Sequence, residues 1–577
     1  MESSPTSALG PEFRAGDWLV RPGECRIVNP QGEVRLRPML MDLLVLLAAR
    51  AGQVVRKDEI LDRLRDSQFV SESALTSDVA ELRQLLGDSR SKPRYIETVP
   101  KRGYRFIAPV IRSARTEPRL AVLIFENLNR DPEQDYFAEG ISDALITELG
   151  NIPSLRVISR QSVLRYKGTT KSLPEIAGEL KVDDIIEGSA LYSHSRFRVS
   201  AQLVQADPER HLWTQSYECA ITNILRVQNR IARSIAEAVQ AALTPKDLAR
   251  LSRTEPVNPE AHLAYLKGRY YLSQWTRDGI ARGFQLLHRA TEIDPDYAPP
   301  YVQLAEGLVV LGYWGHMPPQ QAYTQAKEAA VKALDLDDLL SDAHTFLGDT
   351  SWLLDWDLDR CEREMRRAVE LNPSSQLAHL FYANFLITAR NQREEGVREA
   401  TLALELDPLS VSTNFHFAYM LLFAGEYERA RAQTVSTLER SPDCLHAWYA
   451  RGFAEIGLRQ YGAAVTSFEK AVALSADPFS LAYLGHALGR AGQTDRARAI
   501  LNDLRARRAG EDLAEFIFAL VYIGLAECDA AFESLEKCYA ERDGRLFWLQ
   551  VVPCFHPLRG DPRFADLARR VGLPPQK

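Results

Sequence analysis

The spacing of hydrophobic residues predicts an α+β unit at the start of the chain. Between residues 13 and 36, apolar and polar positions alternate among Gly and Pro breaks, which is typical of a small antiparallel sheet. Apolar residues at helical spacing then predict three helices, from Pro38 to Arg50, from Val54 onward, and from Ser71 to Gly87. Tyr95 to Phe106 is predicted to form two short strands around a basic turn. We expect this unit to cover residues 12–110.

A different pattern over residues 119–245 predicts an α/β domain, which follows a polar linker at 111–118. Leu120 to Phe125 is a continuous apolar run, as in a strand buried on both faces. Further apolar segments predict, in order, helix 137–149, strand 155–159, helix 173–180 and strand 184–190. Alternation over 196–204 and 211–214 then predicts an antiparallel meander.

From Pro259 onward the chain repeats. Ala430 precedes Ala464 by 34 residues, and small residues recur at matching places where two helices would cross. Prolines mark the expected turns, at positions 259, 295, 373, 408 and 442. This period is the tetratricopeptide signature, and it predicts about eight helix pairs over 258–545 with a cap at 546–577. Such an all-α solenoid presents a concave surface lined by the first helix of each pair.

Charge separates the first unit from the rest. The chain has a net charge of −7, but residues 13–112 hold 18 Lys and Arg against 13 Asp and Glu, and the remainder is acidic. A basic front on an acidic body predicts that the front contacts a polyanion. No apolar run reaches the ~18 residues of a membrane span, and residues 1–11 lack the pattern of a signal peptide. We therefore expect a cytoplasmic protein.

Seven cysteines at scattered positions, without a C-x-x-C pair, favour reduced thiols. We expect no metal and no cofactor. Five histidines fall in predicted first helices of the repeats, which leaves a pH-sensing or metal-lined groove open beside ordinary packing: His344, His379, His416, His446 and His486.

The third helix and the hairpin that follows it form a candidate DNA-reading device. The helix would enter the major groove, with the hairpin beside it on the backbone or in the minor groove. Candidate DNA-contacting residues are Ser73, Thr76, Ser77 and Arg83 on the helix, Thr98, Lys101, Arg102, Tyr104 and Arg105 on the hairpin, and Arg56 and Lys57 at the second helix. The alternatives are a surface hairpin with a solvated basic edge and, for Arg83, a salt bridge to the domain body.

These residues carry a family resemblance. Leu82-Arg83 late in the helix, Tyr95-Ile96-Glu97-Thr98-Val99, and then Gly103-Tyr104-Arg105-Phe106 resemble the OmpR/PhoB type of winged helix-turn-helix domain. Members of that family often place Arg where this chain has Ser73 and Glu81. The helix also carries Asp78. We therefore expect the hairpin, which is the wing of this domain type, and the helix termini to provide most of the DNA affinity.

The middle domain resembles the TolB N-terminal module, on the pattern N-L-x-x-D-P-E-Q-x-Y-F-A-x-G-I that begins at Asn127. That resemblance implies a non-catalytic domain. An enzyme is the alternative, because acidic residues crowd the start of one helix: Asp131, Glu133, Asp135, Glu139 and Asp143. However, the segment after Phe125 lacks a Gly-rich phosphate loop, and the helix dipole explains acids at this place.

The segments Tyr265-Leu266-Lys267-Gly268-Arg269 and Ala298-Pro299-Pro300-Tyr301, together with the three-part order, resemble the HilA/CadC-like family of bacterial regulators. That resemblance implies transcription activation. We therefore expect a one-component activator that binds double-stranded promoter DNA, is not an enzyme, and receives a protein or ligand signal through the middle and repeat domains. RNA polymerase or a regulatory protein is the expected repeat partner, and a homodimer is open. The alternatives are a repeat scaffold with a non-DNA-binding winged domain, motivated by Asp78 and Glu81, and a nucleotide-using enzyme.

Overall fold

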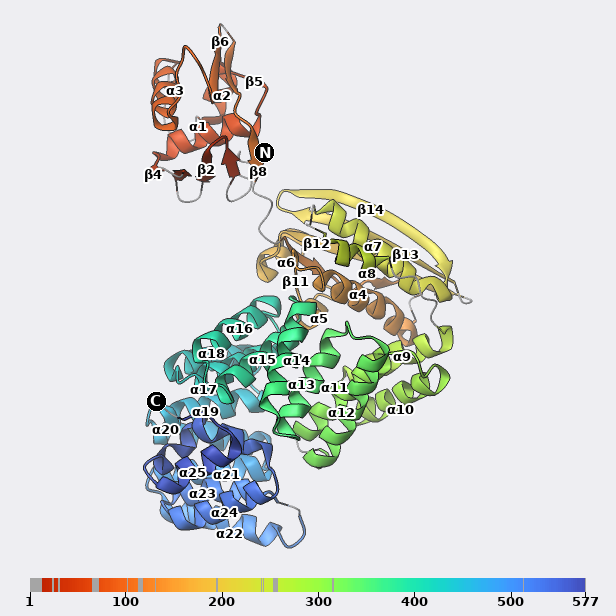
Figure 1. Ribbon diagram of the computed structural model, residues 1–577, viewed down its shortest axis with the longest axis vertical. Coiled ribbons are helices and arrows are strands. Elements are labelled where there is room, and N and C mark those ends of the chain that lie inside the picture. Colours follow the sequence, from red (N-terminus) through yellow and green to blue (C-terminus); the bar gives the residue numbers. More distant parts are fainter. Residues whose placement is uncertain are drawn as a thin grey trace. The chain divides into compact units, whose positions relative to one another are not determined.

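Figure 1 presents the computed structural model of the 577-residue chain. It describes residues 13–22, 25–29, 32–64, 72–100, 102–112, 118–129, 131–193, 196–239, 241, 243–252, 258–274, 276–313, 316–511 and 513–575. The chain divides into two compact units. The first is Met1–Pro118 with Asp207–Arg210, and the second is Arg119–Ala206 with His211–Lys577.

The first unit begins with the predicted antiparallel sheet. Its strand order is β4-β3-β2-β1-β8. The strands are β1 (Phe13–Ala15), β2 (Trp18–Arg21), β3 (Arg26–Asn29), β4 (Gly32–Arg35) and β8 (Val110–Arg112). β8 pairs with β1, with Phe13 opposite Arg112, so the sheet continues two residues past the boundary expected at residue 110.

Three helices pack beside this sheet, α1 (Pro38–Ala49), α2 (Lys57–Leu64) and α3 (Glu72–Leu86). The first and third match their predicted ranges closely, although Ser71, the expected cap of α3, lies outside the described residues. Leu75, Val79, Leu82 and Leu86 of α3 are buried in one core with the apolar face of α1. Their spacing of three or four residues leaves the opposite side of α3 exposed.

The wing is part of a three-stranded sheet in the order β5-β7-β6. Its strands are β5 (Val54–Arg56), β6 (Ile96–Val99) and β7 (Gly103–Phe106). The prediction that a helix starts at Val54 is therefore wrong for three residues. Val55 pairs with Tyr104 of β7, and α2 begins afterwards at Lys57. β-branched residues at 54 and 55 suit a strand, but the partner lies about fifty residues away in the sequence.

The middle domain carries a mixed sheet in the order β11-β9-β12-β13-β14, as the α/β pattern predicts. The strands are β9 (Arg119–Val122), β10 (Glu126–Asn127), β11 (Arg156–Val157), β12 (Asp184–Ser193), β13 (Arg196–Ala206) and β14 (Glu209–Ala220). The helices are α4 (Asp135–Gly150), α5 (Arg160–Leu164), α6 (Leu173–Leu180), α7 (Ile224–Ala238) and α8 (Pro245–Leu251), with the 3-10 helices η4 (Pro132–Gln134) and η5 (Ile221–Asn223). The strand expected at 155–159 is shorter: β11 covers Arg156–Val157, and the Ser159 amide hydrogen-bonds to Leu406 outside the sheet.

Two separate cores cover the two faces of this sheet. α4 and α7 share a core with Phe197 and Val199 of β13. α5 and α6 share the other core with Ala121 and Ile185. Figure 1 shows α4 and α7 beside the long strands β12, β13 and β14.

Within the described residues, the rest of the chain contains eight helix pairs, where the repeat period predicted about eight. They are α9 (Pro259–Leu272) with α10 (Arg277–Ile293), α11 (Pro299–Tyr313) with α12 (Pro319–Leu336), α13 (Ser341–Leu353) with α14 (Leu358–Leu371), α15 (Gln376–Thr388) with α16 (Arg393–Leu406), α17 (Val411–Phe423) with α18 (Tyr427–Arg440), α19 (Leu445–Gly457) with α20 (Tyr461–Leu474), α21 (Pro478–Arg490) with α22 (Thr494–Arg507), and α23 (Glu515–Gly524) with α24 (Cys528–Ala540). Small residues let paired helices approach. A Cβ at Gly452, for example, would meet the ring of Phe468 in the second helix of the same pair.

The C-terminal segment enters the inner side of the solenoid. It consists of η6 (Gly544–Gln550), η7 (Pro553–Leu558) and α25 (Pro562–Val571). The Trp548 ring lies 6.3 Å from those of Tyr313 and Phe516 and 6.5 Å from that of Phe423, which are in the first helices α11, α23 and α17. Rather than covering one end as a cap, this segment fills the concave side of the repeats.

This C-terminal segment is too extensively buried to detach reversibly from the repeats. Leu546, Phe547, Leu549 and Phe555 are fully buried, and Leu558 is 1% exposed. Each such side chain contributes roughly 1.5–3 kcal/mol on burial, so the five together approach the stability of a whole domain. The segment is therefore part of the core of the repeat region.

The middle domain is hydrogen-bonded to turns between successive helix pairs. The Val157 amide donates to Ser374 Oγ over 3.1 Å, in the turn between α14 and α15. One repeat later, the Ser159 amide donates to the Leu406 carbonyl over 2.8 Å, and Ser162 Oγ donates to Asp407 Oδ1 over 2.6 Å. These hydrogen bonds join the middle domain to two consecutive repeats. Within the described residues, no helix has the length and apolarity to cross a membrane.

Candidate nucleic-acid interface

The exposed side of α3 is uncharged. Five residues at helical spacing have exposed side chains along it: Ser73, Thr76, Ser77, Ala80 and Gln84. Three of them are among the predicted DNA-contacting residues, and Ala80 and Gln84 were missed. Hydroxyl, amide and methyl groups are the kinds of side chain that contact base edges in a major groove. The signal that would have identified Ala80 and Gln84 is their spacing of seven residues from Ser73 and Ser77.

The acidic residues of α3 lie beside this face and are paired within the domain. Arg37, which precedes α1, contacts both Asp78 and Glu81, with 3.4 Å between Arg37 Nη2 and Asp78 Oδ1. Asp78 and Glu81 motivate the interpretation that this domain does not bind DNA. The Arg37 contacts reduce the repulsion that two free carboxylates would exert on a phosphate backbone.

Arg83 does not lie on the exposed side of α3, contrary to our expectation. Its side chain is buried, and its guanidinium donates to the Ile96 carbonyl over 3.1 Å and 2.7 Å and to Thr98 Oγ1 over 2.9 Å. Burial lowers the pKa of Arg83. The partner is the backbone of β6 rather than a carboxylate, so the salt bridge considered for Arg83 is also absent among the described residues. Arg83 therefore connects α3 to the wing.

The wing strands approach closely at Gly103. A Cβ there would overlap the Val55 carbonyl oxygen, so residue 103 has to be glycine for β5 and β7 to pair. Arg102 lies in the turn with an exposed side chain, and its amide donates to the Val99 carbonyl over 3.1 Å. Lys101 lies outside the described residues.

Two predicted wing contacts are differently placed. The Tyr104 ring is buried in the domain core, with 4% of its surface exposed, which contradicts the expectation that it contacts DNA. Thr98 is half-buried and accepts the hydrogen bond from Arg83. Arg105 is partly exposed, and its Nε lies 3.3 Å from Glu97 Oε2 across the strand pair.

The other predicted phosphate-contacting residues, Arg56 and Lys57, lie where β5 meets α2. Arg56 is exposed, and its Nε is 3.7 Å from Asp58 Oδ1. Lys57 begins α2. At this distance and exposure the Arg56–Asp58 pair is weak, so the Arg56 side chain can turn toward another anion.

Asp88 organises the loop between α3 and the wing and was missed by sequence reasoning. Its carboxylate accepts hydrogen bonds from the amides of Arg94, Tyr95 and Ile96, over 2.6, 3.2 and 2.8 Å. An acid that directly follows the glycine at the end of a helix is the signal that could have identified it.

Three of the five acidic residues noted in the middle domain form ion pairs: Asp135, Glu139 and Asp143. Arg160 Nη2 lies 2.6 Å from Glu139 Oε2, and Arg160 Nε lies 2.8 Å from Asp143 Oδ1. Lys167 Nζ is 2.6 Å from Asp135 Oδ2. These pairs give those three acids a structural role. Among the described residues, no three His, Cys, Asp or Glu side chains are arranged to hold a metal ion.

The histidines of the first helices have structural contacts. His344 Nδ1 lies 2.6 Å from Glu364 Oε2, and its Nε2 lies 3.0 Å from the Asp338 carbonyl. His379 makes the corresponding pair of contacts one repeat later. Burial lowers the pKa of His416 and of His486 to about 4, so both are neutral near pH 7. The ordinary packing interpretation therefore fits these residues.

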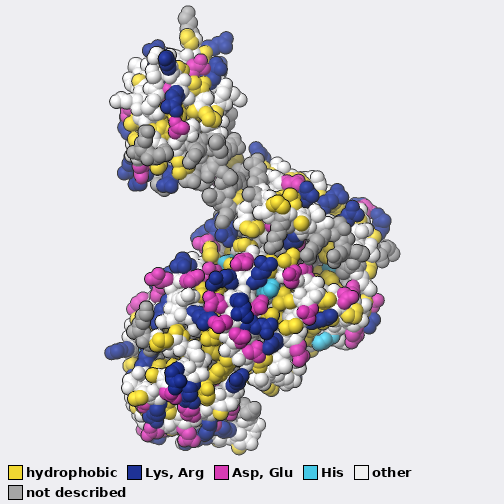
Figure 2. All heavy atoms as spheres, in the orientation of Figure 1, with side chains coloured by type: hydrophobic (Ala, Val, Ile, Leu, Met, Phe, Trp, Pro, Cys, Tyr) yellow, Lys and Arg dark blue, Asp and Glu magenta, His cyan; other side chains and the backbone are white. Residues whose placement is uncertain are grey.

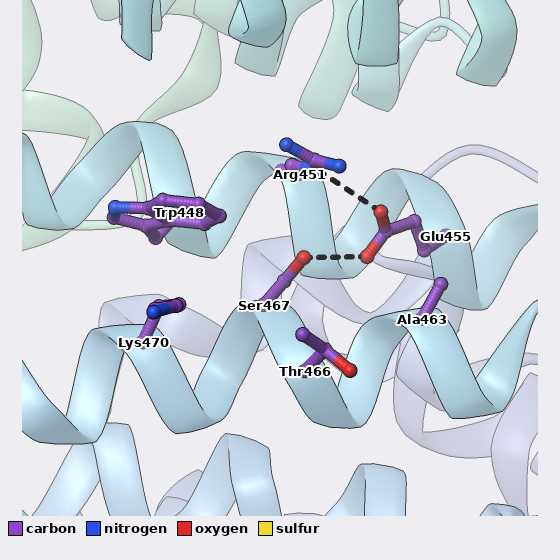
Figure 3. A pocket seen from close by; sticks show the side chains of 7 residues that line it. All are labelled: Trp448, Arg451, Glu455, Ala463, Thr466, Ser467 and Lys470. Atoms are coloured by element: carbon purple, nitrogen blue, oxygen red, sulfur yellow. Dashed lines mark hydrogen bonds and ion pairs between the residues drawn. The ribbon is translucent and has the colours of Figure 1, made fainter. Parts of the chain in front are cut away.

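In a shallow cleft between α19 and α20, polar side chains that line the cleft bond to one another (Figure 3). Buried Glu455 accepts from Arg451 Nε over 3.1 Å and from Ser467 Oγ over 2.6 Å. The Arg451 guanidinium lies 5.5 Å from the centre of the Trp448 ring. These contacts hold the two helices together. Figure 2 shows basic and acidic side chains interspersed over the visible face of the repeats.

Comparisons with known proteins agree with this arrangement. A family model described as transcriptional regulatory protein, C terminal, matches residues 31–106, and a tetratricopeptide repeat model matches residues 445–478. The chain is 25% identical to the transcriptional regulator HilA of Salmonella typhimurium over 421 residues, which cover 70% of this chain and 72% of HilA. It is 40% identical to the transcriptional activator CadC of Escherichia coli over 102 residues, which cover 18% of this chain and 20% of CadC.

A third relative is named "Putative adenylate cyclase 3", from Rhizobium meliloti; it is 32% identical over 240 residues, and the match spans 41% of each chain. Among solved structures, the DNA-binding domain of E. coli CadC matches with 38% identity and a TM-score of 0.17, over 18% of this chain and 97% of that one. The chain thus joins an OmpR/PhoB-type winged helix domain to tetratricopeptide repeats and is homologous to the HilA and CadC transcriptional regulators.

Proposed function

We propose that this protein is a transcriptional regulator, and specifically an activator, that binds promoter DNA through its winged domain. The observation that carries the proposal is the uncharged, exposed face of α3, from Ser73 to Gln84, next to a wing whose turn holds Arg102. The match of the winged-domain family model and the homology to HilA and CadC support it.

In this proposal α3 reads the major groove through Thr76, Ser77 and Gln84. Arg83 acts indirectly, because it fixes the angle between α3 and β6. Lys101, Arg102 and Arg105 of the wing, with Arg56 and Lys57 at the start of α2, neutralise phosphates. Phosphate contacts provide affinity and register, whereas base contacts provide sequence preference.

The test measures promoter binding by the full-length protein, with fluorescence anisotropy as the readout, at salt concentrations from low to moderate. Each phosphate contact contributes about 0.9 to the slope of log affinity against log salt. The double change Lys101→Ala, Arg102→Ala should reduce that slope by about 2 and weaken binding. Arg429→Ala on α18 removes an exposed arginine outside the winged domain and should leave the slope unchanged. An identical slope in the double variant would exclude the wing as a DNA contact.

The middle and repeat domains are proposed to receive the signal, without catalytic activity of their own. Because the C-terminal segment fills the inner side of the repeats, we place the site for RNA polymerase or a regulatory protein on the outer helices. Crosslinking of the protein to chromosomal DNA across the genome would identify its promoters. If removal of residues 1–112 left the cellular phenotype intact, the scaffold alternative would replace this proposal.

A further inference from the structure

The two edges of the middle-domain sheet differ. The short edge strand β11 is covered, because Ser374 of the repeats accepts from the Val157 amide over 3.1 Å and donates to the Leu155 carbonyl over 3.3 Å. The opposite edge is β14, whose one neighbour in the described sheet is β13. Figure 1 shows β14 at the margin of this domain.

β14 has the properties of a pairing surface. It is 12 residues long, against a usual strand length of about 5–6 residues. Edge strands are ordinarily protected from pairing by Lys, Pro or a short length. β14 contains neither Lys nor Pro, and β-branched or aromatic residues occupy its centre, with Trp213 and Thr214 followed by Tyr217. Most of its side chains are exposed.

The two faces of β14 have different surroundings. Tyr217 is buried and packs in the core with α7, and Trp213 and Cys219 lie half-buried against the same core. On the other face, Ser216 Oγ lies 3.0 Å from Ser200 Oγ of β13, and Glu218 pairs with Arg198 over 3.0 Å. A strand added beside β14 can therefore extend both a hydrophobic layer and a polar layer.

The sequence of β14 is complementary to itself in one antiparallel register. A two-fold axis perpendicular to the sheet at Thr214 places Arg210 of each copy opposite Glu218 of the other, and Trp213 opposite Gln215. Opposite charges on directly facing residues stabilise a strand pair. Moving the axis to a neighbouring residue removes both charge pairs.

We propose that β14 pairs with β14 of a second copy of this chain, antiparallel about Thr214, and joins two middle domains through one continuous sheet. This dimer rests on the proposed function for its purpose, since it would supply two winged domains for two DNA half-sites. The pairing itself depends on the strand alone.

The test uses full-length protein without DNA, in sedimentation velocity over a range of concentrations. Thr214→Lys places two like charges on the axis and should raise the dimer dissociation constant at least tenfold. Thr466→Lys, at an exposed threonine on α20, is the matched control and should leave it unchanged. A wild-type protein that remains monomeric, or a Thr214→Lys protein that dimerises like the wild type, would overturn the proposal.

A crosslink identifies the register. Thr214→Cys brings two thiols together across the axis and should give a disulfide-linked dimer on mild oxidation. Ser216→Cys, two residues from the axis, should not, because its counterpart lies beyond disulfide reach. Equal crosslinking of both variants would exclude this register. A protein that crosslinks at Thr214→Cys but fails to bind promoter DNA would keep the dimer and refute the DNA-binding function.

Discussion

Two surfaces of this molecule were predicted to bind partners, and they differ in what the folded chain leaves available. The outer side of α3 keeps Ser73, Thr76 and Ser77 exposed. The inner side of the repeats is occupied by the chain's own C-terminal segment, with Phe547 and Phe555 fully buried there. A repeat period predicts that a concave side exists, but the remainder of the chain decides whether a partner can reach it. The following changes test this difference, from the largest expected effect to the smallest.

Phe547→Ala tests whether the C-terminal segment is part of the core. The Phe547 ring packs 5.3 Å from Trp352 and 5.5 Å from Trp356, so truncation leaves a cavity. We expect a loss of about 3–5 kcal/mol in the free energy of unfolding of the repeat region, measured with urea and Trp fluorescence. Val435→Ala on α18, where the side chain is 40% exposed, should change it by less than about 0.5 kcal/mol. Similar losses in the two variants would mean that the segment is loosely attached.

Asp349→Asn tests whether water reaches the interior of the repeat region. Asp349 on α13 is 3% exposed, and its Oδ2 has no hydrogen-bond partner among the described residues. Burial raises the pKa of Asp349 from 3.8 to about 7, so its ionisation costs stability progressively as pH rises from about 4 to about 7. The variant should be more stable than the wild type by up to about 4 kcal/mol at pH 8 and nearly equal at pH 3. A stability difference independent of pH would show that water reaches this carboxyl.

Arg83→Met tests the connection between α3 and the wing. It removes the donors to the Ile96 carbonyl and Thr98, at a cost of about 1–3 kcal/mol in the stability of the winged domain. DNA affinity should fall equally for matched and mismatched promoters. Ser77→Ala should instead leave stability unchanged and alter the preference among promoters. If Arg83→Met changed the preference and preserved stability, Arg83 would be a base contact after all.

Arg37→Ala has the smallest expected effect. Arg37 is largely exposed, so its pairs with Asp78 and Glu81 should contribute less than about 1 kcal/mol to stability. On the proposed function, promoter binding should weaken several-fold at low salt, because two carboxylates beside the exposed side of α3 lose their counter-charge. Adding Asp78→Asn and Glu81→Gln should restore it. Binding that is insensitive to all three changes would separate these acids from DNA recognition.

Local patterns predicted the helices well and the placement of polar side chains poorly. α1 and α3 follow from apolar spacing and the helix pairs from the 34-residue period, because helical hydrogen bonds and contacts within a repeat are made over short stretches of sequence. β5 was missed because three residues become a strand through pairing with β7, about fifty positions later. Arg83 was assigned to the groove because helix periodicity identifies a flank of α3 but not the β6 carbonyl beside it.

The C-terminal segment illustrates the same limit at a larger scale. Its apolar residues, from Leu546 to Phe555, are visible in the sequence but have no regular period. The rings of Tyr313 and Phe423 that contact Trp548 lie more than a hundred residues earlier. Long-range packing of this kind depends on the curvature of the whole solenoid, which repeat spacing does not specify.

The position of Trp548 has a consequence for how this architecture can change in evolution. Because one indole contacts α11, α17 and α23 at once, the number of helix pairs between those helices is part of the fit. An open solenoid can gain a 34-residue repeat by duplication, or lose one by deletion, with little cost in stability. In this protein an inserted repeat would separate surfaces that meet on a single side chain. Homologues that retain a tryptophan at this place should therefore retain the same number of repeats.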